Sequence, residues 1–87
     1  MFPTVTDFQA IIQILISTAQ AYGEPYCDIK AGELHRFVGG YPNENHRMPA
    51  CNRAMRNLFL EGVDEVILEP AQGQGASLTI RYNLPRP

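Results

Sequence analysis

The stretch AGELHRFVGGYPNENHRMPACNRAMRNLFL, residues 31–60, decides the fold because it encodes two short amphipathic helices joined by a turn. The first of these helices is expected to take Asp28 as its cap and to end at Gly39 and Gly40, where glycine favours a helix C-terminus. Its apolar side carries Leu34, Phe37 and Val38. Its polar side carries Glu33, His35 and Arg36.

The second helix of this stretch is predicted to run from Pro49 to Leu60, after a turn over residues 41–48. Proline is welcome in a first helical turn, and it disfavours helix in the residue before it. One face of this helix carries Cys51, Ala54, Met55, Leu58 and Phe59. The opposite face is predicted to carry Asn52, Arg53, Arg56 and Asn57.

A longer helix precedes this pair, and we expect Thr6 to cap it with Gln9 completing a capping box. Its apolar residues recur at steps of three and four, which predicts a single buried stripe of Phe8, Ile11, Ile12, Leu15, Ile16, Ala19 and Tyr22. Ile14 lies off that stripe, which indicates contacts on more than one side of the helix. Gly23 and Pro25 end it.

The remaining segments favour β-structure. Residues 26–29 form either a brief strand or an extended lead-in. Residues 65–69 and 77–82 predict a hairpin, and in the second of these segments Leu78, Ile80 and Tyr82 alternate with polar residues. The uncharged, glycine-rich residues 70–76 predict its tip. We expect Arg81 to pair across the hairpin with Glu65 or Glu69.

Composition indicates one globular domain. The chain has 87 residues, of which 45% are hydrophobic and 18% are charged. No basic, apolar leader opens it, so the cytoplasm is the expected location and the thiols of Cys27 and Cys51 are expected to be reduced. The longest apolar run is too short to span a bilayer, so no membrane association is expected.

This order of elements is similar to that of a winged helix-turn-helix domain, an α+β fold. The resemblance covers Thr6 to Tyr82, and "AGELHRFVGGYP" resembles the second helix and turn of small bacterial regulators. It implies that the helix from Pro49 to Leu60 enters the DNA major groove and that residues 70–76 form the wing. Two departures are a longer turn between the helices and a wing tip that carries Gln72 and Gln74 in place of Lys or Arg.

The charge distribution agrees with a DNA-binding role. Although the net charge is −2, residues 31–60 carry four arginines against two glutamates, a net charge of +2. No acidic residue lies between Arg47 and Leu60, so the polar face of the third helix has no local counter-charge. Arginine and asparagine bond bidentately to guanine and adenine. We therefore expect Asn52, Arg53, Arg56 and Asn57 to contact bases in double-stranded DNA, and Arg36, His46, Arg47, Gln72 and Gln74 to contact its backbone.

This interpretation makes the chain a small transcriptional or mobile-element regulator. Its simplest rival is an ordinary solvated helix face. Another alternative is a protein-interaction module without DNA binding, favoured by Ile14, the neutral wing and the acidic residues Glu61, Asp64, Glu65 and Glu69. A homodimer formed through the first helix on a two-fold DNA site is a further alternative.

Catalytic and metal chemistry are not expected. The candidate zinc ligands Cys27, His35, His46 and Cys51 lack the close pairs of structural sites, so buried thiols are the better interpretation. No acid, base and nucleophile occur at a spacing that would form a catalytic group. The sequence thus predicts neither an enzyme nor a cofactor.

Overall fold

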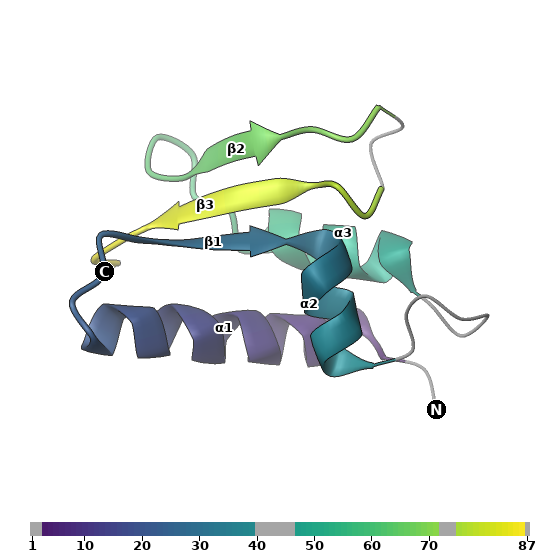
Figure 1. Cartoon of the computed structure of the whole chain (residues 1–87), viewed down its shortest axis with the longest axis horizontal. Helices are drawn as coiled ribbons and strands as arrows, with labels where there is room; N and C mark the ends of the chain where they lie inside the picture. The colour runs from purple at the N-terminus through teal and green to yellow at the C-terminus, as the bar shows by residue number, and fades with distance from the viewer. Residues whose placement is uncertain (1–2, 40–46, 72–74, 87) are drawn as a thin grey trace.

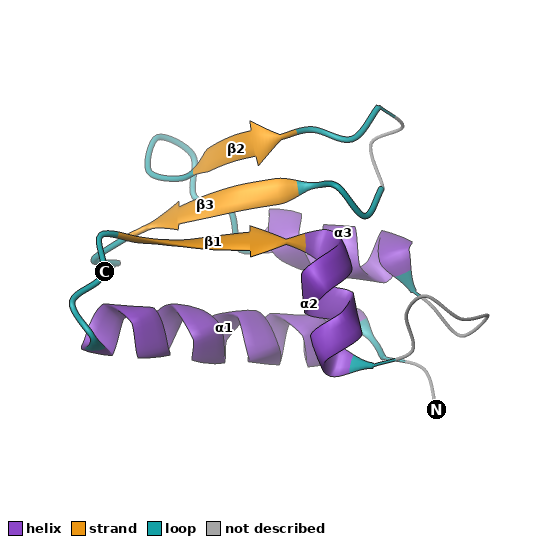
Figure 2. Cartoon of the chain, in the orientation of Figure 1, coloured by secondary structure: helices purple, strands orange, loops and turns teal. Residues whose placement is uncertain are grey.

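The computed structural model describes residues 3–39, 47–71 and 75–86 (Figure 1). In chain order its elements are α1 (Val5–Ala21), β1 (Tyr26–Lys30), α2 (Ala31–Val38), α3 (Met48–Asn57), β2 (Glu65–Leu68) and β3 (Thr79–Asn83). The described residues therefore form an α+β fold with three helices and one antiparallel sheet of three strands (Figure 2).

The sheet has the strand order β1-β3-β2, so the last strand of the chain lies in the middle. Ile80 of β3 stands opposite Ile29 on one side and Val66 on the other. The next residue, Arg81, stands between Asp28 and Glu65 on the opposite face. The hairpin of residues 65–69 and 77–82 is confirmed, and residues 26–29 form a strand.

One face of the sheet covers the hydrophobic core, and α1, α2 and α3 close the core from the other side (Figure 1). The predicted alternation in the last strand is confirmed, because Leu78, Ile80 and Tyr82 are all buried. The Tyr82 hydroxyl donates a hydrogen bond to the Met55 carbonyl at 2.8 Å and so joins β3 to α3. Buried residues of α1 complete the core: Phe8, Ile12 and Ile16.

The α1 helix begins earlier than predicted. Thr4, not Thr6, is its N-cap: the Thr4 hydroxyl accepts the Asp7 N–H, and the Asp7 carboxylate accepts the Thr4 N–H. The charged Asp7 is a stronger acceptor than the amide of Gln9, so this box prevails over the predicted one. Tyr22, expected on the buried stripe, is 81% exposed because it lies past the last helical residue.

The α2 helix is rotated relative to the predicted assignment of its faces. His35 is fully buried and Phe37 is 70% exposed, the reverse of the expectation. The His35 ring packs edge-on against Phe8, with centroids 4.9 Å apart. Asp28 does not cap α2, because it lies in β1 and binds Arg81. Lys30 is the N-cap residue, and its side chain makes no capping bond.

Candidate nucleic-acid interface

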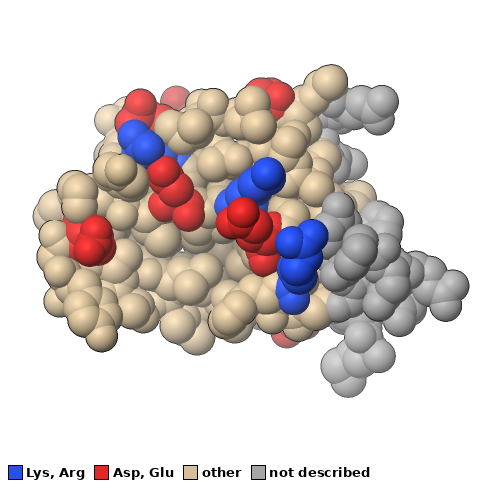
Figure 3. Space-filling view, in the orientation of Figure 1, with Lys and Arg blue, Asp and Glu red and all other residues tan. Residues whose placement is uncertain are grey.

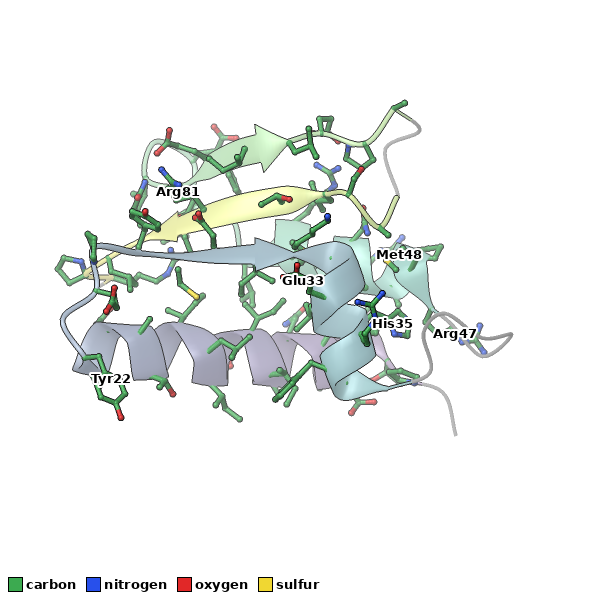
Figure 4. All side chains as sticks on the ribbon, in the orientation of Figure 1. Tyr22, Glu33, His35, Arg47, Met48 and Arg81 are labelled. Carbon is green, nitrogen blue, oxygen red and sulfur yellow. The ribbon has the colours of Figure 1, made fainter. Side chains whose placement is uncertain are left out.

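The start of α3 is fixed by a buried histidine of α2. The backbone N–H of Arg47, the N-cap residue, donates to His35 Nε2 at 2.5 Å. In Figure 4 His35 points from α2 toward the start of α3, where Arg47 and Met48 lie. Pro49 sits in the first turn as predicted, but the helix ends at Asn57 and not at Leu60. The bond therefore sets where α3 begins relative to α2.

The inner face of α3 is occupied by core packing. Met48, Cys51, Ala54 and Met55 are buried, as the apolar pattern from Cys51 onward predicts. The Cys51 thiol donates to the Ala31 carbonyl at 3.5 Å, and burial raises its pKa to about 12. A thiol that stays protonated at neutral pH is a poor metal ligand and a poor nucleophile.

The outer face of α3 presents Arg53 to solvent. Arg53 is exposed and forms no ion pair with any residue in the described ranges. It borders a shallow hollow of about 240 Å³ that is also lined by Val5, Pro49 and Ala50. Arg53 therefore has the exposure that a base contact would require.

Arg56 has a carboxylate partner that the sequence pattern did not reveal. Its guanidinium Nη2 lies 2.5 Å from Glu69 Oε1, and the two side chains are 39% and 53% exposed. Glu69 follows β2, so the counter-charge comes from a distant segment of the chain and not from α3. A solvent-exposed ion pair of this kind contributes roughly 0–1 kcal/mol to the free energy of folding, and salt weakens the attraction between its charges.

The two asparagines of α3 differ from each other. Asn57 is exposed and donates from Nδ2 to Gln9 Oε1 of α1 at 3.0 Å. Asn52 is only 1% exposed, and its Nδ2 donates to the Met48 carbonyl at 3.2 Å and to the Gly75 carbonyl at 3.3 Å. The prediction that Asn52 shares the outward face is therefore wrong. Positions 48, 51, 52 and 55 follow the i, i+3, i+4, i+7 spacing of a buried helix face, a signal that would have placed Asn52 inside.

The α3 helix thus contacts the connection between β2 and β3 at two points. Arg56 binds Glu69, the first residue of the connection, and Asn52 binds Gly75, which lies within it. The middle of the connection, including the predicted backbone contacts Gln72 and Gln74, lies outside the described residues, as does His46. These two contacts hold the helix and the root of the hairpin in a fixed relation.

The start of α2 contacts the same hairpin root. The N–H groups of Ala31 and Gly32, the first two of α2, donate to the carbonyls of Leu78 and Ala76, each at 2.8 Å. A Cβ on Gly32 would come within 3.2 Å of the Ala76 carbonyl oxygen, so only glycine fits without displacement. Both α2 and α3 are therefore bonded to the same end of the hairpin.

Arg36, the predicted phosphate contact of α2, is exposed. It lines a hollow of about 290 Å³ with Lys30 and Ser77, and Glu33 lines the same hollow. Figure 3 shows that positive and negative side chains alternate across this face and do not gather into one positive patch. The charge of Arg36 is therefore partly offset by a neighbouring carboxylate.

Arg81 has a different partner from the one predicted. Its guanidinium binds both oxygens of Asp28, at 2.8 and 2.9 Å, and stacks on the Tyr26 ring at 3.9 Å. The prediction of a pair with Glu65 or Glu69 is wrong in its partner, because β1 flanks β3 on its other side and provides the closer carboxylate. Arg81 is therefore held on the outer face of the sheet.

No protein-family model, curated protein or solved structure matches the chain. Among the described helices, none has both the length and the apolar character needed to cross a bilayer. Within the same ranges no three His, Cys, Asp or Glu side chains gather as a metal site would need.

Proposed function

We propose that the chain is a winged-helix domain that binds double-stranded DNA, with α3 in the major groove and the β2–β3 connection as the wing. The observation that carries the proposal is the outer face of α3, where Arg53 is exposed beside Arg56 on a helix without acidic residues. The contacts from Arg56 to Glu69 and from Asn52 to Gly75 support it, because they fix the helix and the wing root as one surface.

In this proposal the residues have distinct roles. Arg53 reads base edges, and Arg56 joins it after exchanging Glu69 for DNA, an exchange that costs at most about 1 kcal/mol for an exposed pair. Asn57 assists them, whereas Asn52 positions the wing root. Backbone phosphates are contacted by Arg36, Arg47, His46, Gln72 and Gln74. The protein would then act as a small transcriptional or mobile-element regulator, on a two-fold site if it dimerises.

The test is selection from a random pool of duplex DNA, followed by titration of the selected duplex at two salt concentrations. Replacement Arg53→Ala should weaken binding about tenfold or more, because a bidentate base contact is lost. Raising salt from about 50 to 200 mM should weaken binding by the wild type steeply, because phosphate contacts release counterions.

The matched control is Arg81→Ala, which removes the same charge from the outer face of the sheet. It should leave duplex affinity close to that of the wild type. Failure to select any duplex, or equal losses in the two variants with unchanged circular dichroism, would refute DNA binding through α3. An interaction module without DNA binding would then take its place.

A further inference from the structure

The segment from the end of α3 through β2 exposes an unusual number of aliphatic side chains. Five aliphatic residues of this segment are each between 38% and 49% exposed. We call them the aliphatic edge: Leu60, Val63, Val66, Ile67 and Leu68. Three of them are consecutive in β2. Contiguous exposed apolar residues on a small domain are typical of a surface that binds a partner.

The backbone of this edge is also open. β2 pairs with β3 on one side, and on its other side no strand of the described residues lies against it. The strand is short and carries an irregularity between Val66 and Leu68, where the register with β3 shifts. Its outer N–H and C=O groups are therefore placed to accept an added strand over a short length.

Acidic residues surround the aliphatic edge. Glu61, Glu65 and Glu69 are all exposed along it. Glu65 accepts a bond from Asn83 Nδ2 at 3.3 Å, and Glu69 binds Arg56. Asp64 is buried and faces inward, so it adds no charge to the rim. A ligand that covers the edge therefore meets apolar surface in the middle and, beside it, the carboxylates of Glu61 and Glu65, while the charge of Glu69 is offset by Arg56.

This charge pattern selects among partners. Two copies paired through β2 would bring their glutamates together: in the register centred on Ile67, Glu65 of each copy lies opposite Glu69 of the other. Like charges that face each other across a strand pair are destabilising. A nucleic acid would be repelled by the same carboxylates. A basic polypeptide segment has the complementary charge.

We propose that the aliphatic edge binds an extended segment of another polypeptide, with apolar side chains in its middle and Lys or Arg at its flanks, as an added strand beside β2. This inference does not depend on DNA binding, because the aliphatic edge lies between α3 and the end of β2, and the two surfaces meet only at the pair of Arg56 with Glu69. A variant at Arg53 should leave it intact.

A library of random dodecapeptides displayed on phage, panned against the full chain, tests the proposal. The enriched peptides should alternate apolar residues and carry Lys or Arg near their ends. The most enriched one, synthesised and added to isotopically labelled protein, should shift the amide signals of residues 65–68. Replacement Ile67→Lys should weaken its binding about tenfold or more, because an aliphatic contact is lost.

The matched control is Ile14→Lys, the same substitution at an isoleucine of α1 that is 58% exposed. It should leave peptide affinity unchanged, while Glu65→Gln should weaken it about threefold through loss of one carboxylate. The proposal is overturned if no peptide is enriched, if the enriched peptides are acidic, or if both lysine variants lose affinity equally. It is also overturned if the chain sediments as a dimer that Ile67→Lys dissociates.

Discussion

The imidazole of His35 accepts the backbone N–H of Arg47 at 2.5 Å, and this bond ties the N-cap of α3 to a buried side chain of α2. The two residues are 12 apart in sequence and bracket the segment that joins the two helices. A buried side chain of α2 therefore sets the position of the start of α3.

We expect His35→Phe to lower the free energy of unfolding by about 1–3 kcal/mol, because the ring volume is kept while the acceptor is lost. His35→Ala should cost roughly 3–5 kcal/mol, since it also leaves a cavity beside Phe8. Urea denaturation measures both. The neighbouring exposed substitution Arg36→Ala is the control and should stay within about 0.5 kcal/mol. A His35→Phe variant as stable as the wild type would show that the bond does not position α3.

A second prediction concerns acid stability. The side chain of Asp64 accepts the N–H groups of Leu60 and Asn83 at 2.8 and 3.0 Å and binds the Arg86 guanidinium at 2.7 and 3.0 Å. Burial alone would raise the pKa of Asp64, but the bonds from Arg86, Leu60 and Asn83 outweigh it and hold the pKa below its ordinary value. The ionised carboxylate therefore stabilises the fold above the ordinary Asp pKa of about 3.9, and that stability is lost as the pH falls.

Asp64→Asn should consequently lower the free energy of unfolding at neutral pH by roughly 3 kcal/mol, because it leaves the partly buried Arg86 charge without its partner. It should also flatten the fall in stability between about pH 5 and pH 3. Urea midpoints across this range measure both effects. Asp28→Asn breaks the more exposed pair with Arg81, and its stability should fall with pH over this range as steeply as that of the wild type. An unchanged slope in Asp64→Asn would contradict this account of the carboxylate.

The two cysteines should differ in reactivity. Cys51 is fully buried with a pKa of about 12, whereas Cys27 is half-buried, and burial followed by the nearby Asp28 charge raises its pKa. An aromatic disulfide reagent at mildly alkaline pH should therefore modify Cys27 slowly and Cys51 only after unfolding in urea. The variants Cys27→Ser and Cys51→Ser show which cysteine reacts in the slow native-state modification and which reacts after unfolding. Rapid modification of Cys51 in the native protein would contradict its burial.

The link between α3 and the hairpin root can be broken at Asn52. Replacement Asn52→Asp keeps the shape of the side chain but places a carboxylate against the carbonyl oxygens of Met48 and Gly75. We expect the free energy of unfolding to fall by about 2–4 kcal/mol at neutral pH, because the carboxylate is buried and cannot donate the two hydrogen bonds that the Asn52 amide makes. Hydrogen exchange should also quicken for the Leu78 amide, which donates to Gly75.

The matched control for Asn52→Asp is Asn57→Asp, the same change on the exposed side of the helix. It should shift stability by only a few tenths of a kcal/mol. Equal effects of the two substitutions would mean that the Asn52 bonds contribute nothing.

The elements and their order could be predicted from local patterns, because alternation in residues 77–82 and steps of three and four in residues 8–19 are properties of contiguous sequence. The faces of the short helices were harder to assign. In α2, only eight residues long, His35 exchanged sides with Phe37 because a tertiary hydrogen bond favours the imidazole inside.

The candidate interface was predictable only in part, and for a related reason. Arg53 is exposed as its helical position indicates. The carboxylate that binds Arg56 comes from Glu69, 13 residues away, and the carbonyl that holds Asn52 comes from Gly75, 23 residues away. Contacts at such separations depend on how the hairpin packs on α3, and no periodicity within α3 encodes them.

The central position of β3 has a consequence for synthesis of the protein. Within the described part of the chain, β1 and β2 each pair with β3 and with no other strand, and β3 ends at Asn83. A nascent chain on the ribosome can form α1 as soon as it emerges, but neither outer strand finds its neighbour until the last strand has left the exit tunnel. The three-stranded sheet can therefore be completed only after nearly all of the described chain has been translated.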